Sequence, residues 1–230
     1  MTIRMKQNGQ WTQPRALPVK VAGAIRLTQV GYVKVNGVWS IFFEAFKSIK
    51  FTGHCNGPNS TNGFHYETIS NATYVVQSGD KLIYDIQQHG PTLQSGLDGA
   101  ISRNGSWIEN LRDFNRDTVQ GGDGSRIKDQ RGFLIHPGTG NVSAAGVWTQ
   151  RIFDLAVLVG LTVGPWCVAF EGDVAGDYTT FFRDIKIVDA NGNVKLTIFN
   201  KTLDVAGLST YMNTSNNYTS IAKVVDTSPL

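Results

Sequence analysis

Aromatic and planar polar residues are the part of this sequence that most plainly could do chemistry. The C–H face of a sugar ring stacks on an indole or phenol ring, and its hydroxyls bind planar polar side chains. Four residues that fit this chemistry, with amide and acidic residues beside them, are Trp107, Trp148, Arg151 and Tyr178. We predict a carbohydrate-binding site from them, and we expect Trp107 to be the most exposed. The alternative is that the Trp residues belong to the core, where Trp is usually found.

A run of carboxylates and glycines, residues 171–177, is a second candidate site. Calcium binds several oxygen atoms supplied by a flexible loop, so Asp173, Asp177 and the nearby Asp184 are candidate ligands. The spacing is not that of an EF-hand, and Asp and Gly are also common in ordinary turns. We therefore expect no cofactor, with calcium at these three residues as the alternative.

A longer acidic stretch could supply the two carboxylates that glycoside hydrolysis requires. Its members are Glu109, Asp113, Asp117, Asp123 and Asp129. The sequence places no pair of them at a catalytic separation, and such stretches are typical of surface loops. The four histidines show neither ligand spacing nor a nucleophile motif. We predict a protein that is not an enzyme, and a glycan depolymerase or esterase is the alternative.

Composition limits the classes of fold and partner. The chain has 230 residues, of which 17% are charged and 25 are Gly, a mixture typical of turn-rich β proteins. The net charge of +3 comes without any basic run, so we expect no nucleic-acid partner. No apolar run is long enough to span a membrane, and we expect a soluble protein made in the cytoplasm. The two cysteines, Cys55 and Cys167, predict buried free thiols.

Residues 1–46 contain a repeat of three copies, centred on Asn8-Gly9, Ala22-Gly23 and Asn36-Gly37. Asn and Gly tolerate the positive φ angles of a type I′ turn, so each copy predicts a minimal β-hairpin. Short hairpins are marginal alone and must pack on something else. We predict an attachment segment that contacts an assembly. The alternative is an arm that packs on its own domain.

Residues 47–230 predict one β-sandwich domain, because about ten short strands alternate with loops rich in Gly and Asn. Alternation over residues 178–187 places Phe181, Arg183, Ile185 and Ile187 on one face, and we expect that face to be the inner one. A weaker alternation over residues 218–225 favours a final strand. The predicted fold class is all-β, a jelly-roll sandwich preceded by hairpin repeats.

Four segments, residues 147–155, 158–163, 168–173 and 176–187, together resemble the second half of galactose-binding-like jelly rolls. That family includes carbohydrate-binding modules of bacterial enzymes and of phage tail proteins. The resemblance implies a glycan-binding domain. In its calcium-bearing members an acidic residue of the last strand holds the ion, and Asp184 is the corresponding residue here.

The segment Gly31–Trp39 resembles a short sequence common in virion proteins of tailed phages. It implies a tail, fibre or tail-tip component that binds other virion proteins through its N-terminal segment. Such proteins are often trimers or rings, so we expect a homo-oligomer located in the virion. Its expected ligand is a polysaccharide of the host surface. The alternative is a capping or decoration protein that binds no sugar.

Overall fold

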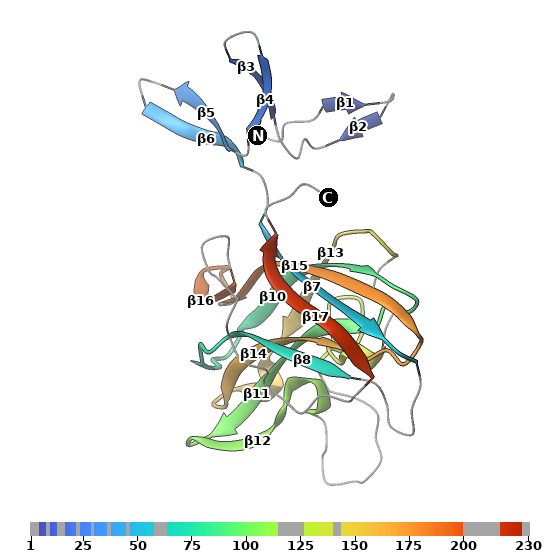
Figure 1. Cartoon of the computed structure of the whole chain (residues 1–230). Helices are drawn as coiled ribbons and strands as arrows, with labels where there is room; N and C mark the ends of the chain where they lie inside the picture. The colour runs from blue at the N-terminus through green and yellow to red at the C-terminus, as the bar shows by residue number, and fades with distance from the viewer. Residues whose placement is uncertain are drawn as a thin grey trace. The chain divides into compact units, whose positions relative to one another are not determined.

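The computed structural model describes residues 47–57, 64–114, 127–139, 144–199 and 217–226, together with the backbone of six strands between residues 5 and 44. The chain divides into two compact units. The hairpin unit is Met1–Lys47 with Asp226–Leu230, and the sandwich unit is Ser48–Val225. Both are built from strands, which confirms the predicted all-β class (Figure 1).

The hairpin unit contains three antiparallel pairs of strands. They are β1 (Met5–Gln7) with β2 (Gln10–Thr12), β3 (Leu17–Val21) with β4 (Ala24–Thr28), and β5 (Val30–Val35) with β6 (Val38–Glu44). The register is the same in each: Lys6 is opposite Trp11, Lys20 opposite Ile25, and Lys34 opposite Trp39. Two residues separate the strands of each pair, so the predicted hairpins are confirmed. Each pair forms a two-stranded sheet of its own.

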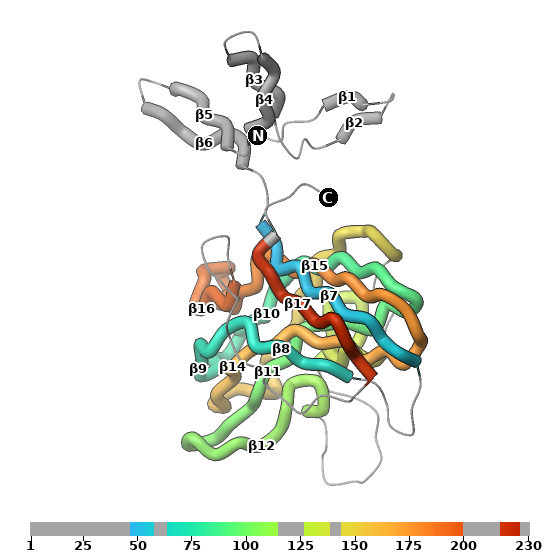
Figure 2. Tube along the Cα trace, viewed as in Figure 1, coloured from blue at the N-terminus to red at the C-terminus, as the bar shows by residue number. Residues whose placement is uncertain are grey.

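The sandwich unit contains two antiparallel sheets. The six-stranded sheet has the order β13 (Thr149–Asp154), β10 (Lys81–His89), β15 (Gly176–Val188), β7 (Ser48–Cys55) and β17 (Tyr218–Asp226), and β16 (Val194–Phe199) also pairs with β15. In Figure 2, β7 from the start of this unit lies beside β17 from its end. β17 confirms the final strand predicted for residues 218–225.

The five-stranded sheet has the order β12 (Ser106–Asn110), β11 (Ser95–Arg103), β14 (Thr162–Phe170) and β8 (His65–Ser70), and β9 (Tyr74–Val75) also pairs with β14. Three short 3-10 helices, η1 (Leu111–Asp113), η2 (Pro137–Thr139) and η3 (Ala156–Leu158), lie between strands. None of the helices in the described part of the chain is long and apolar enough to cross a membrane.

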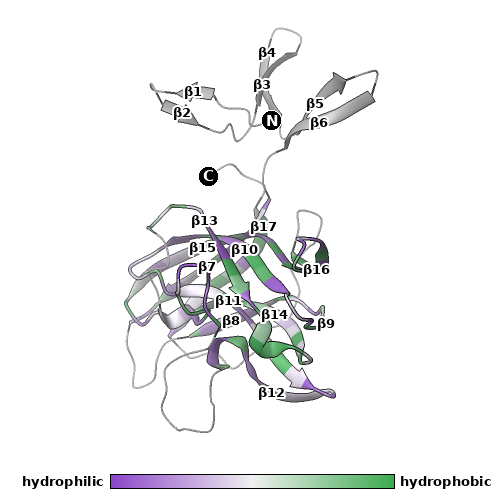
Figure 3. Ribbon diagram, turned by 180° about the vertical axis from the view of Figure 1, so that it is seen from behind, coloured by the Kyte–Doolittle hydropathy of each residue, from purple (hydrophilic) through white to green (hydrophobic). Residues whose placement is uncertain are grey.

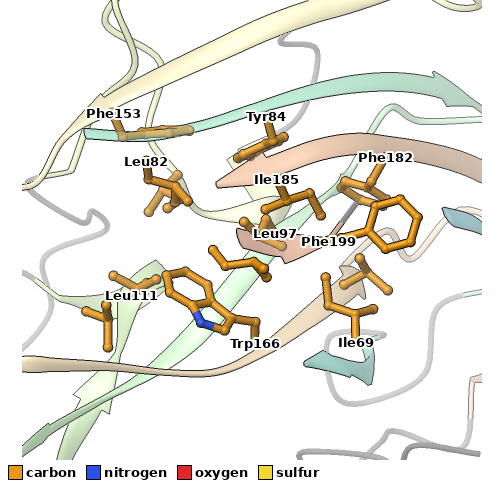
Figure 4. Close-up of a cluster of buried hydrophobic side chains, with 14 of the residues drawn as sticks. Ile69, Leu82, Tyr84, Leu97, Leu111, Phe153, Trp166, Phe182, Ile185 and Phe199 are labelled. Atoms are coloured by element: carbon orange, nitrogen blue, oxygen red, sulfur yellow. The ribbon is translucent and has the colours of Figure 1, made fainter. Parts of the chain in front are cut away.

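The core fills the space between the two sheets. Figure 4 shows Trp166 and Leu97 of the five-stranded sheet beside Tyr84, Phe182 and other side chains of the six-stranded sheet. Hydrophobic and hydrophilic residues alternate along several strands in Figure 3, as expected where one face of a sheet is buried. Each fully buried large apolar side chain contributes about 1.5–3 kcal/mol. Cys55 and Cys167 are buried free thiols, as predicted.

A β-bulge in β15 corrects the predicted alternation of that strand. Asp184 has a φ of 52°, and the pairing with β10 shifts so that Lys186 is opposite Ile83 while Arg183 is opposite Asp85. The extra residue reverses the facing of the side chains that follow it. The core contains Tyr178 and Phe182 from before the bulge. It contains Ile185 and Ile187 from after it. The prediction that Phe181 and Arg183 share the inner face is therefore wrong.

We expect the backbone conformation of Asp184 to limit which residues the bulge accepts. Asp184→Val should lower the free energy of unfolding by about 1–2 kcal/mol, because a side chain with a Cβ, and a branched one above all, is strained at positive φ. Asp184→Gly removes the same exposed ion pair to Lys186, worth about 0–1 kcal/mol, but no strain arises. Urea denaturation of the two variants measures the difference. Equal destabilisation by both would show that the ion pair, and not the conformation, matters.

Candidate functional site

The outer face of the six-stranded sheet carries an aromatic ring surrounded by planar polar groups. We call it the Trp148 face. Strand pairing places Phe181 of β15 between Lys50 of β7 and Gln87 of β10. In the next row, Asp85 of β10 lies between Arg183 of β15 and Gln150 of β13. Its members are Lys50, Asp85, Gln87, His89, Trp148, Gln150, Phe181 and Arg183.

Trp148 is half-buried and lies directly before β13. The guanidinium carbon of Arg183 lies 4.0 Å from the centroid of the Trp148 ring, in cation–π contact. The ring of Phe181 is 6.5 Å away and inclined by 56°. Phe181 itself is only 2% exposed, since Trp148, His89 and Lys50 surround it. Trp148 is therefore the aromatic surface of this face that is open to solvent.

The polar groups beside Trp148 are held in fixed orientations. Arg183 Nε donates to Asp85 Oδ2 at 2.9 Å, and Gln150 Nε2 donates to Asp85 Oδ1 at 3.3 Å. All three residues belong to neighbouring strands, so the sheet limits their movement. A guanidinium, a carboxylate and an amide in fixed positions are the kind of groups that bind the hydroxyls of a ligand.

The loop that leads into Trp148 is fastened to the same face. Gln87 Nε2 donates to the carbonyl of Gly146 at 2.6 Å, and the Gly146 N–H donates to the carbonyl of Gln88 at 2.9 Å. Gly146 has a φ of 71°, and a Cβ there would lie 3.3 Å from the His89 ring. Gln87 is 6% exposed, and among the described residues its Oε1 atom accepts no hydrogen bond. The buried Gln87 amide therefore holds the loop before Trp148 against the sheet.

The structure separates the four predicted sugar-binding residues. Trp107 is 64% exposed, as expected, but it belongs to β12 of the five-stranded sheet. Trp148 lies on the opposite sheet, so the two rings do not share a face. Tyr178 and Arg151 are each 1% exposed, and the prediction that they contact a sugar is wrong.

Both buried residues have structural partners instead. The Tyr178 hydroxyl is 3.0 Å from Thr92 Oγ1 and donates to the carbonyl of Val174 at 2.9 Å. Arg151 Nε donates to Asp129 Oδ2 at 3.0 Å, and its Nη2 donates to the carbonyl of Leu134 at 2.6 Å. The sequence of β13 did not indicate that Arg151 points inward. Its partner Asp129 is distant in the sequence, so no local pattern connects the two residues.

The three predicted calcium ligands do not come together. Asp177 Oδ1 is 2.7 Å from His54 Nδ1, and Asp184 Oδ2 accepts from Lys186 at 2.7 Å. Asp177 and Asp184 are seven residues apart on one strand, which corresponds to roughly 20 Å. In the part of the chain that the structure describes, no group of three or more His, Cys, Asp or Glu side chains could hold a metal ion. Asp173, Asp177 and Asp184 therefore do not form one site.

A second group of titratable side chains lies on the outer face of the five-stranded sheet. We call it the Glu171 cluster, and its members are Tyr66, Asp98, Arg112, Asp113, His136 and Glu171. Arg112 donates to Glu171 and to Tyr66, and its Nε donates to Asp113 Oδ2 at 2.9 Å. His136 Nδ1 is 3.1 Å from Glu171 Oε2, which also accepts from the Gly138 N–H at 2.9 Å.

Sequence reasoning found little of this cluster. Of the predicted acidic stretch, Asp113 joins the cluster, Asp129 binds Arg151, and Glu109 lies on β12. Asp117 and Asp123 lie outside the described residues. The cluster joins β11, β14 and the segments around η1 and η2, so no local sequence pattern could have indicated it.

Burial controls protonation in the Glu171 cluster. It raises the pKa of Glu171 to about 8, although the Gly138 N–H opposes the shift. It also raises the pKa of Asp98 to about 6, against the lowering effect of Arg112 and of the N–H groups of Gly99 and Arg112. The folded chain therefore holds protons that the unfolded chain releases.

Comparisons with known proteins identify no family for this chain. No family model and no curated protein matches it. One similar solved structure is described as "PbXyn10C CBM APO". It is 16% identical over 78% of this chain and 89% of that chain, with a TM-score of 0.34. Similarity at this level does not establish function, so the proposal below is based on the chain's own residues.

We expect stability to fall as the pH rises from about 5 to about 9. Carboxyls with raised pKa values bind more protons in the folded than in the unfolded state, so alkaline pH removes stability, on the order of 5 kcal/mol in total. Glu171→Gln, which keeps the neutral form, should flatten the dependence. Thermal unfolding across this pH range measures it.

The control for this prediction is Asp173→Asn, which changes an exposed carboxylate and should leave the dependence unchanged. A wild-type melting temperature that rises between pH 5 and pH 9 would contradict the assignment of a protonated buried carboxyl.

Proposed function

We propose that the sandwich unit is a non-catalytic glycan-binding domain and that the Trp148 face binds the polysaccharide. The observation that carries the proposal is the arrangement of Trp148, Arg183 and Asp85. A half-buried indole ring, a guanidinium stacked on it and a carboxylate bound to that guanidinium lie together on a sheet.

The chemistry of this arrangement suits a sugar. An indole offers a flat apolar surface to C–H groups, while the guanidinium, the Asp85 carboxylate and the Gln150 amide offer donors and acceptors to hydroxyls. Adjacent strands hold these groups before a ligand arrives, which reduces the entropy lost on binding.

The contacts of the Glu171 cluster support a structural role for that cluster over a catalytic one. Both oxygens of Glu171 are engaged, one by Arg112 and the other by Gly138 and His136. Asp113 is engaged by the same guanidinium. These contacts attach η1 and η2 to the sheet, and we propose that the protein hydrolyses no glycan.

For the hairpin unit we propose attachment to a larger particle. Two-stranded sheets are marginal alone in water, and this unit repeats one such sheet three times in the same register. The resemblance of Gly31–Trp39 to tailed-phage virion sequences supports a tail, fibre or tail-tip component, present as a homo-oligomer in the virion. Other virion proteins are then the partners of the hairpins, and a host-surface polysaccharide is the ligand of the sandwich.

The glycan-binding proposal predicts that Trp148→Ala weakens binding about tenfold, which corresponds to about 1.4 kcal/mol. Binding to a panel of bacterial surface polysaccharides, followed by calorimetry, measures the loss. Trp107→Ala is the matched control, because it removes an exposed indole from the other sheet, and it should change affinity less than twofold. Thermal unfolding of both variants tests that they fold.

Two results would contradict this assignment. Failure of the folded protein to bind any polysaccharide would remove the proposed function. Loss of binding in Trp107→Ala with full binding in Trp148→Ala would place the site on the other sheet.

The attachment proposal predicts a specific effect of deleting residues 1–46. The truncated protein should be missing from purified particles when it is produced together with the other particle proteins, while the full chain is present. Because the sandwich is a separate compact unit, its thermal unfolding should still be cooperative. Incorporation of the truncated protein at the level of the full chain would contradict the attachment role.

A further inference from the structure

We propose that the polysaccharide of the Trp148 face is acidic and that Lys50 binds its carboxylates. The inference rests on the proposed function and specifies the chemical class of the ligand. It follows from how the charges of this face are paired.

Lys50 supplies an ammonium group that has no anionic partner in the described part of the chain. It is half-buried on β7, opposite Phe181, with its Nζ atom 5.8 Å from the centroid of the Phe181 ring. Among the residues that the structure describes, the lysines in ion pairs are Lys186 and Lys223, and Lys50 forms none. The side chain therefore holds a positive charge beside the Phe181 ring, whose other neighbours include Trp148.

The carboxylates of this side of the sheet are already engaged. Asp85 accepts hydrogen bonds from Arg183 and Gln150. Asp177 is bonded to His54, and Asp184 is paired with Lys186. Of these three carboxylates, Asp85 and Asp184 are paired with cations and Asp177 is hydrogen-bonded to His54, whereas Lys50 forms no ion pair among the described residues.

A uronic acid residue matches this arrangement. Its C–H face can pack on the indole ring, and its carboxylate can extend toward the Lys50 ammonium, which lies beside the neighbouring Phe181 ring. The exposed imidazole of His89, whose ring centroid is 6.0 Å from that of Phe181, adds a polar group on the same face. A neutral sugar would use the ring but would leave the Lys50 charge without a partner.

The test compares uronate-containing bacterial polysaccharides with the same polymers after reduction of their carboxyl groups. We expect the native polymers to bind the full chain at least fivefold more tightly than the reduced ones. In Lys50→Met, which keeps the length of the side chain, this preference should disappear. Raising the salt to about 1 M should weaken native binding and leave reduced binding unchanged, because salt screens ionic contacts.

Lys186→Met is the matched control. Lys186 is a lysine of the same sheet beyond the bulge, and its ammonium already pairs with Asp184. This variant should keep the preference for native polymers. Loss of the preference in both variants would indicate an effect of total charge and would overturn the role of Lys50.

The outcomes separate the inference from the function on which it rests. Equal or tighter binding of the reduced polymers would overturn the acidic ligand and leave glycan binding intact. Absence of binding by either form, in a protein that unfolds cooperatively, would overturn both.

Discussion

The bulge at Asp184 is the constraint on which the two faces of the six-stranded sheet depend. β15 is the longest strand of the sandwich, and it pairs with β7 and β16 as well as with β10. Without the extra residue, the strand could not direct Phe182 and Ile185 into the core while Phe181 and Arg183 face outward. The positive φ of Asp184 therefore lets Ile185 and Ile187 join the core although Arg183, just before the bulge, faces outward and stacks on Trp148.

The outer faces of the two sheets use charged residues in different ways. On the Trp148 face, ion pairs and amides lie at the surface beside an aromatic ring, where a ligand can reach them. In the Glu171 cluster, the titratable groups are enclosed and bind one another, with Asp98 fully buried and Glu171 nearly so. The first arrangement suits recognition, and the second fastens the segments around η1 and η2 to the sheet.

The sequence predicted the class of the fold because that information is local. Turn residues and alternation mark each hairpin and most strands, and the exposure of Trp107 follows from its neighbours at the Asn104-Gly105 turn. The faces of β15 could not be predicted, since a shift of one residue reverses every later side chain and nothing in the sequence marks Asp184 as a bulge. Arg151 and Glu171 were missed for another reason: their partners are brought close by the fold and are distant along the chain.

The most direct test of the central claim is a nuclear magnetic resonance titration of the indole N–H signals with a fragment of a polysaccharide that the protein binds. The account predicts that the Trp148 signal shifts saturably, together with the Arg183 Nε–H signal. The signals of Trp107 and the buried Trp166 should stay in place. A saturable shift of Trp107 with no change at Trp148 would contradict the account, since binding would then occur at the edge of the five-stranded sheet.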